Sequence, residues 1–150
     1  MRRSDSKGFS AAELLVAVGI TALIFGITLA AFGNIARRES LVASTSALAE
    51  GIRDARARTL ASVGASQYGV KIDEDRFTFF KGSAFSSSTP GNETFVFTSW
   101  VKASTSVSSL VFERVTGNAS ASGTIEMYLV TSPSTKKTVR VQSTGLVGIE

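Results

Sequence analysis

The feature that most constrains this chain is an uncharged apolar run close to its N-terminus. No side chain is charged from Leu14 to Phe32, whereas residues 1–8 carry three basic side chains. As a helix, residues 9–32 rise about 36 Å, which exceeds the roughly 30 Å hydrocarbon core of a bilayer. The run is also longer than the apolar core of an ordinary secretory signal peptide. Residues 9–32 are therefore predicted to form a membrane-spanning helix.

Basic residues on both sides of this run bear on its orientation. Arg2, Arg3 and Lys7 reach the insertion machinery before Arg37 and Arg38 do, and positive charge near a membrane span favours the cytoplasmic side. We therefore predict a single-pass protein of the cytoplasmic (inner) membrane. Its N-terminus is expected in the cytoplasm, and the C-terminal part outside it.

Glu13 is the unusual residue of the run, because a carboxylate within an apolar span costs about 2.5 to 3.5 kcal/mol at the bilayer centre. Two interpretations follow from its position near the start of the helix. The side chain can reach the membrane interface and interact with the positive end of the helix dipole. Alternatively, it has a functional partner within the membrane, as many intramembrane charges do.

The sequence around Glu13 carries a recognisable pattern. Residues 7–16 read KGFSAAELLV, and they resemble the class III signal sequence of type IV prepilins and type II secretion pseudopilins. Gly8, Phe9 and Glu13 match the framework of that motif. The residues at 10, 11 and 12 depart from the threonine, leucine and isoleucine that are usual there.

This resemblance implies a processing reaction and an assembly contact. A membrane-embedded prepilin peptidase would cut between Gly8 and Phe9 on the cytoplasmic side, removing residues 1–8 as a leader. The same enzyme would methylate the new amino group of Phe9. Glu13 would then pair with the terminal amine of an adjacent subunit, so that two charges that are costly in lipid offset one another.

The helical pattern continues beyond the apolar run, over residues 33–62. Five residues in this part fall at spacings that place them on one face of a helix, and they are Leu41, Thr45, Leu48, Ile52 and Ala55. Asp54 and Arg58 have the spacing of a favourable i,i+4 ion pair. We predict a helix whose second half packs on a sheet.

Residues 63–150 change to the period of two that is typical of strands. The acidic turn at residues 73–75 separates two such runs, which predicts a hairpin. The expected strands are residues 68–72, 77–80, 94–100, 107–115, 124–130, 138–141 and 146–149. A long helix followed by antiparallel strands is an α+β arrangement.

The globular part adds a second, weaker resemblance. Residues 49–61, 67–70, 110–112 with Gly117, and 139–145 resemble the GspH/FimT group of minor pilins and H-type pseudopilins. This resemblance implies the pilin fold, in which the second half of the N-terminal helix packs on a C-terminal antiparallel β-sheet domain.

Composition argues against an enzyme. The chain has no histidine and no cysteine, which excludes zinc sites of the usual kind and histidine-based acid–base or triad chemistry. The carboxylates of residues 73–75 could bind a hard cation, but a hairpin turn is the preferred interpretation. We expect no catalytic residue, no metal and no cofactor.

The leading functional hypothesis is a structural minor pilin or pseudopilin of a type IV pilus, type II secretion or competence filament. Its expected partners are the prepilin peptidase and methyltransferase, other (pseudo)pilin subunits and an inner-membrane assembly platform. One alternative is a DNA-receptor minor pilin, for which Lys136, Lys137 and Arg140 are the candidate phosphate contacts. Another is a single-pass membrane-anchored protein that is never processed.

Overall fold

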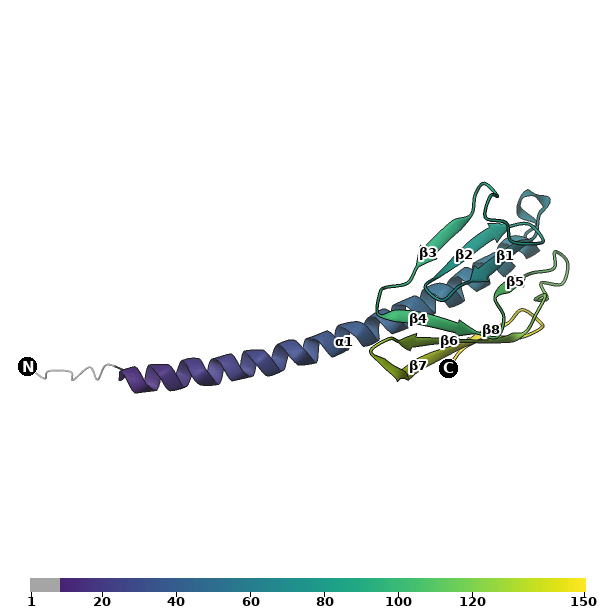
Figure 1. The fold of residues 1–150 in the computed structure, drawn as a ribbon. Coiled ribbons are helices and arrows are strands. Elements are labelled where there is room, and N and C mark those ends of the chain that lie inside the picture. The colour runs from purple at the N-terminus through teal and green to yellow at the C-terminus, as the bar shows by residue number, and fades with distance from the viewer. Residues whose placement is uncertain (1–8) are drawn as a thin grey trace, which may run out of the picture. The chain divides into compact units, whose positions relative to one another are not determined.

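The computed structural model describes residues 9–150, except for the side chains of residues 29–31. One long helix, α1 (Ala11–Leu60), is followed by a short 3-10 helix, η1 (Val63–Ala65), and by strands (Figure 1). The leader, residues 1–8, lies outside the described residues. The chain divides into two units at Ala36 and Arg37, so α1 contributes to both.

The second unit, residues 37–150, contains two antiparallel sheets of four strands each (Figure 1). In order across the first sheet, the strands are β3 (Glu93–Val96), β2 (Arg76–Lys81), β1 (Tyr68–Ile72) and β5 (Ser109–Val111). The second sheet consists of β4 (Val101–Thr105), β6 (Gly123–Leu129), β7 (Ser132–Val141) and β8 (Val147–Ile149). A long helix on antiparallel sheets confirms the α+β prediction, although the strands form two sheets where one was expected.

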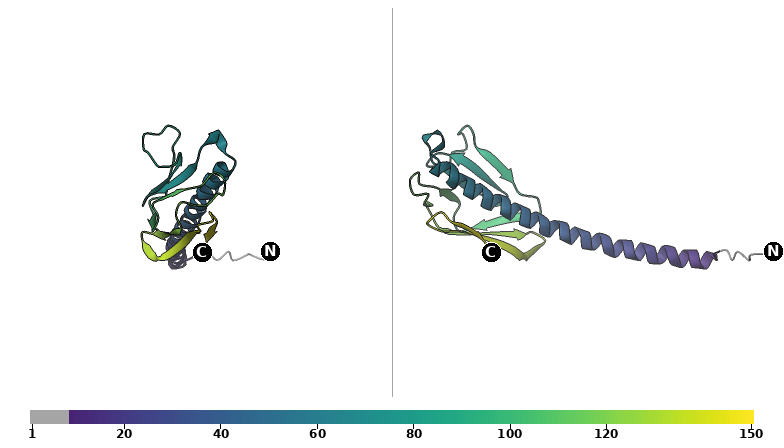
Figure 2. Two further views of the ribbon diagram at one scale, coloured as in Figure 1. Left: turned by 90° about the vertical axis from the view of Figure 1, so that its right-hand side faces the viewer. Right: turned by 180° about the vertical axis from the view of Figure 1, so that it is seen from behind.

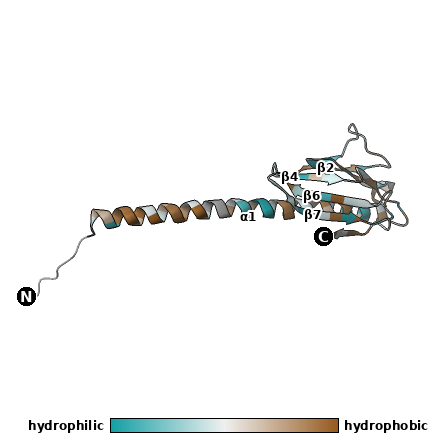
Figure 3. Cartoon of the chain, turned by 60° about the horizontal axis from the view of Figure 1, so that its bottom comes forward, coloured by the Kyte–Doolittle hydropathy of each residue, from teal (hydrophilic) through white to brown (hydrophobic). Residues whose placement is uncertain are grey.

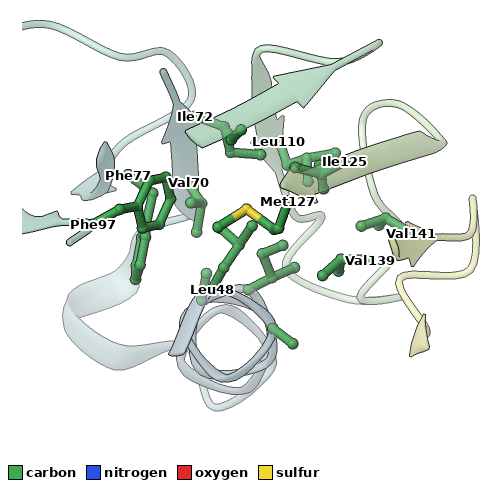
Figure 4. Close-up of a cluster of buried hydrophobic side chains, with 14 of the residues drawn as sticks. Leu48, Val70, Ile72, Phe77, Phe97, Leu110, Ile125, Met127, Val139 and Val141 are labelled. Atoms are coloured by element: carbon green, nitrogen blue, oxygen red, sulfur yellow. The ribbon is translucent and has the colours of Figure 1, made fainter. Parts of the chain in front are cut away.

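One face of residues 37–60 of α1 packs on both sheets, as the view from behind in Figure 2 shows. The five residues predicted to share this face are all at most 2% exposed, and they are Leu41, Thr45, Leu48, Ile52 and Ala55. In Figure 4, Leu48 points between Val70 of β1 and Met127 of β6. The helix therefore supplies the layer that joins the two sheets into one core.

Leu48 gives the clearest stability prediction, because its side chain is fully buried between the helix and both sheets. We expect Leu48→Ala to lower the free energy of unfolding by about 2 to 5 kcal/mol, since it leaves a cavity that the sheets cannot close. Leu146→Ala is the matched control, because Leu146 is 54% exposed. Urea unfolding of the two variants measures the difference, and equal losses would contradict this account of the core.

The strand predicted over residues 94–100 was wrong in its extent. β3 ends at Val96, and Phe97 is a buried residue at which the chain leaves the first sheet. The backbone N–H of Phe97 donates to the Asp75 carbonyl, and the N–H of Val101 donates to the Thr98 carbonyl. The chain thus turns from one sheet into the other, and β4, which was not predicted, begins at Val101.

Two further strands differ from their predicted ranges by more than one residue at an end. The run predicted over residues 107–115 contains only β5, because a turn follows Phe112 and brings the chain back to an isolated bridge with Ala119. β7 begins at Ser132, six residues before its predicted start. Its first half is polar and carries no apolar pattern, yet Lys136 and Lys137 pair with Tyr128 and Met127 of β6.

The first unit contains residues 11–36 of α1. Apart from residues 29–31, whose side chains are not described, its large apolar side chains are exposed, and brown predominates along this part of the helix in Figure 3. By length and composition α1 is able to cross a membrane. Thr21 and Thr28 satisfy their hydroxyls by donating to the carbonyls of Ala17 and Ile24, so they add little polarity to this surface.

Candidate functional site

The N-terminus of α1 is capped by a reciprocal pair of hydrogen bonds between Ser10 and Glu13. The backbone N–H of Glu13 donates to Oγ of Ser10 at 3.2 Å, and the N–H of Ser10 donates to Oε2 of Glu13 at 2.9 Å. This is a capping box, in which two otherwise unpaired helix N–H groups are satisfied. The spacing of Ser10 and Glu13 in the sequence could have predicted the box, but that signal was missed.

The box gives Glu13 a defined position without using up its carboxylate. Glu13 is the only charged residue from residue 9 to residue 36, and it lies in the first turn of the helix. An ionised carboxylate has acceptor sites for about four hydrogen bonds, so one bond to Ser10 leaves room for an ammonium group. The geometry thus adds a role as helix cap that the sequence interpretation did not include, and it leaves the carboxylate able to act as a charge partner.

The other predicted processing residues lie at the edge of the described region. Gly8 lies outside the described residues. Phe9 is 87% exposed and precedes the first helical residue by two positions. The described part of the candidate site is therefore one exposed aromatic residue followed by a capped helix start.

The three cations proposed to contact DNA do not share one face of β7. Lys136 and Arg140 lie on the same face, and each is paired with a carboxylate, Glu126 at 2.8 Å and Glu150 at 3.1 Å. Lys137 points to the opposite face, which it shares with Met127 of β6. The sequence predicted three cations free to contact phosphates. In the structure only two of them share a face, and each is already paired with a glutamate.

Two arginines of α1 donate hydrogen bonds to backbone carbonyls that are distant in the sequence, and sequence analysis did not predict these contacts. Arg53 donates from Nη2 to the Val147 carbonyl at 3.1 Å. Arg56 donates from Nε to the Gly117 carbonyl at 3.0 Å and from Nη2 to that of Thr144 at 3.3 Å. These side chains fasten the helix to the β5–β6 connection and the C-terminal segment. The expected ion pair of Asp54 and Arg58 is confirmed at 2.9 Å.

The acidic residues 73–75 form the turn between β1 and β2, which confirms the predicted hairpin. Each carboxylate of the turn has a cationic partner from the same chain. The pairs are Asp73 with Lys71 at 3.5 Å, Glu74 with Lys102 at 2.6 Å, and Asp75 with Arg76 at 2.8 Å. Within residues 9–150 no group of three acidic, histidine or cysteine side chains is placed to hold a metal ion. The carboxylates of the turn thus serve local pairing.

Asp75 gives a pH prediction. Two hydrogen bonds from the Arg76 guanidinium lower the pKa of Asp75 from its ordinary value. A lowered pKa means that the stabilising contribution is present at neutral pH and is lost as the pH falls through that lowered value, below about 3.9. We expect an NMR titration of the Asp75 carboxyl to have its midpoint below that of Arg76→Gln. Identical midpoints in the two proteins would show that the pair has no effect.

Comparison with known proteins was made at the level of sequence and of structure. No protein-family model and no curated protein sequence matches this chain. Among solved structures, the minor pseudopilin EpsH from the type 2 secretion system of Vibrio cholerae is similar, with a TM-score of 0.59 and 14% identity. That match covers 74% of this chain and 96% of EpsH.

The type IV minor pilin FimU of Pseudomonas aeruginosa is also similar. One crystal form gives a TM-score of 0.61 at 13% identity, and the match covers 75% of this chain and 90% of FimU. A second crystal form gives 0.54 at 14% identity, covering 77% and 90%. At such identities the likeness shows the fold alone. The chain therefore has the pilin fold, which it shares with a minor pseudopilin and a type IV minor pilin.

Proposed function

We propose that this chain is a structural subunit, a minor pilin or pseudopilin, of a membrane-derived filament and that it catalyses no reaction. The observation that carries the proposal is the apolar helix at residues 11–36, whose described large apolar side chains are exposed and whose single charge lies in the first turn. A surface that is apolar on all sides needs lipid or other apolar helices around it. The membrane surrounds this helix with lipid before assembly, and the filament core surrounds it with the helices of other subunits afterwards.

Processing prepares the chain to move from the membrane into the filament core. A prepilin peptidase cuts between Gly8 and Phe9 on the cytoplasmic side and methylates the new amine of Phe9. Because Ser10 keeps its backbone N–H after the cut, the capping box remains intact in the mature chain. The terminal amine of one subunit then pairs with Glu13 of its neighbour, which sets the register between adjacent helices.

The proposed function also implies a membrane topology and a set of partners for the chain. Before assembly, α1 crosses the cytoplasmic membrane with its N-terminus inside, and residues 37–150 lie on the extracytoplasmic side. Other (pseudo)pilin subunits and an inner-membrane assembly platform are its partners. DNA binding is not favoured as a second function, because Lys136 and Arg140 are each paired with a glutamate.

Intact mass spectrometry tests this function directly. The chain, expressed with an active prepilin peptidase and extracted from membranes, is expected to begin at Phe9 and to carry one additional methyl group. The same chain expressed without the peptidase provides the control and is expected to begin at Met1. If the N-terminus is the same with and without the peptidase, the chain is an unprocessed membrane anchor.

A further inference from the structure

A groove with an aromatic floor runs between α1 and the edge of the first sheet. It has a volume of about 260 Å³. Helix residues 47, 50, 51 and 54 form one wall, and side chains of β2 and β3 form the other. We call this feature the aromatic groove; its lining is Ala47, Glu50, Gly51, Asp54, Phe77, Phe79, Glu93 and Phe95.

Gly51 makes the aromatic floor possible. A Cβ atom at Gly51 would lie 2.7 Å from the Phe77 ring, so only glycine allows this ring to lie so close to the helix. Phe77 stacks on Phe95 with ring centroids 4.9 Å apart and planes inclined by 12°. Phe95 is 47% exposed. Phe77 and Phe79 are only 2% and 5% exposed, so the floor of the groove presents the ring of Phe95 to solvent.

The charges around this floor are acidic. Asp54 is paired with Arg58, whose guanidinium also lies 4.7 Å above the Phe79 ring. This side of the groove thus already binds one guanidinium through a carboxylate and an aromatic face. Glu50 and Glu93 have no ion-pair partner among residues 9–150. Both side chains line the same groove as Phe95, so the groove offers carboxylates and an aromatic ring to a cation from another molecule.

A complementary projection exists elsewhere on the same domain, in the β5–β6 connection. The turn is closed by hydrogen bonds from the Gly117 N–H to the Glu113 carbonyl and from the Glu113 N–H to the Asn118 carbonyl. Val115 at its tip is 91% exposed. Arg114 beside it has no hydrogen bond or ion pair within residues 9–150. We call residues 114 and 115 the basic tip.

The aromatic groove and the basic tip lie on opposite flanks of α1. Successive helical residues are rotated by about 100°, so Glu50 and Asp54 fall on one side of the buried face, and Arg56 and Leu60 fall on the other. Arg56 holds the carbonyl of Gly117 in the tip loop, and Leu60 lies against the same glycine. Since they lie on opposite flanks, the tip of one molecule is expected to meet the groove of another molecule.

We propose that the basic tip of one copy of this chain docks in the aromatic groove of the next copy. Arg114 lies over the exposed Phe95 ring between Glu50 and Glu93, and Val115 covers the apolar surface beside that ring. The contact is heterologous, so it joins two neighbouring copies through different surfaces and does not close a symmetric dimer. It rests on the proposed function, because a groove this small binds weakly unless the helices already hold the subunits side by side.

Cysteine cross-linking tests the contact cleanly, since the native chain contains no cysteine. Ala47→Cys lies in the groove wall and Val115→Cys at the tip, and both leave the charged residues in place. Full-length chains carrying one or the other are co-expressed with the prepilin peptidase, and their membranes are treated with a mild oxidant. We expect a disulfide-linked product of the two chains. Ser134→Cys, on exposed β7, replaces the tip cysteine in the control and is expected to give little product.

Charge-reversal variants distinguish cross-links that form through the proposed contact from cross-links between subunits that only lie close together in the membrane. Arg114→Glu on the tip chain is expected to lower the cross-linked yield at least about fivefold, because it places like charges together. Adding Glu50→Lys and Glu93→Lys to the groove chain is expected to restore it. Equal yields with Ser134→Cys, or no recovery in the charge-swapped pair, would overturn the proposal. Intact mass of the same samples reports the Phe9 terminus, so loss of docking is distinguished from loss of processing.

Discussion

A Gly8→Val chain is expected to remain at its full length in membranes, with Met1 or its N-terminal remnant still attached. Glycine lets an extended backbone approach closely to a peptidase, whereas a β-branched side chain beside the scissile bond displaces it. A displacement of about 1 Å costs on the order of 100-fold in rate. Immunoblotting and intact mass after co-expression with the peptidase measure the remaining cleavage.

Ser6→Val is the matched control, because it places the same valine side chain two residues before Gly8. It is expected to be processed like the native chain. The two variants should be equally abundant in the membrane, since neither changes residues 9–32. If Gly8→Val is cleaved at the native rate, Gly8 is not required for processing.

Glu13→Gln is expected to leave processing and membrane insertion unchanged but to exclude the chain from filaments. Glutamine retains an oxygen that can accept the Ser10 N–H, so the capping box survives. Only the negative charge is lost. Leaving the neighbouring amine without its partner in an apolar core costs about 3 to 5 kcal/mol, which corresponds to more than a hundredfold less chain in purified filaments.

Ser10→Ala distinguishes the two roles of Glu13. It removes the Oγ that accepts the Glu13 N–H and costs about 0.5 to 2 kcal/mol of helix stability, but it leaves the carboxylate charged. We expect incorporation into filaments within about tenfold of the native level. If Ser10→Ala abolishes incorporation while Glu13→Gln does not, Glu13 acts as a helix cap and not as the pairing residue.

The prediction from sequence was most accurate where structure depends on neighbours along the chain. The buried face of α1 from Leu41 to Ala55 follows from helical spacing alone, and the structure confirms it. The β1–β2 hairpin at residues 73–75 follows from an alternating run and a phenylalanine-rich run on either side of an acidic turn. The missed strand β4 is different, because Phe97 leaves one sheet and Val101 enters another without a glycine or proline to mark the change.

The candidate site shows the same division. The pattern of Gly8, Phe9 and Glu13 lies within six consecutive residues, so the sequence was sufficient to propose processing and charge pairing. The capping box was equally local and could have been predicted from Ser10. By contrast, the neutralisation of Lys136 by Glu126 depends on the register between β6 and β7, which no local pattern revealed.

The sequence by itself determined the apolar helix, its single carboxylate and the order of helix and strands, because hydrophobicity and periodicity act between residues close in the chain. Only the tertiary structure decided that the strands form two sheets and that an aromatic groove lies beside α1. The groove requires Gly51, Phe77 and Glu93 to meet, and these residues are distant in the sequence. Their contact results from packing the helix against the sheet, so it becomes visible only when the whole core has formed.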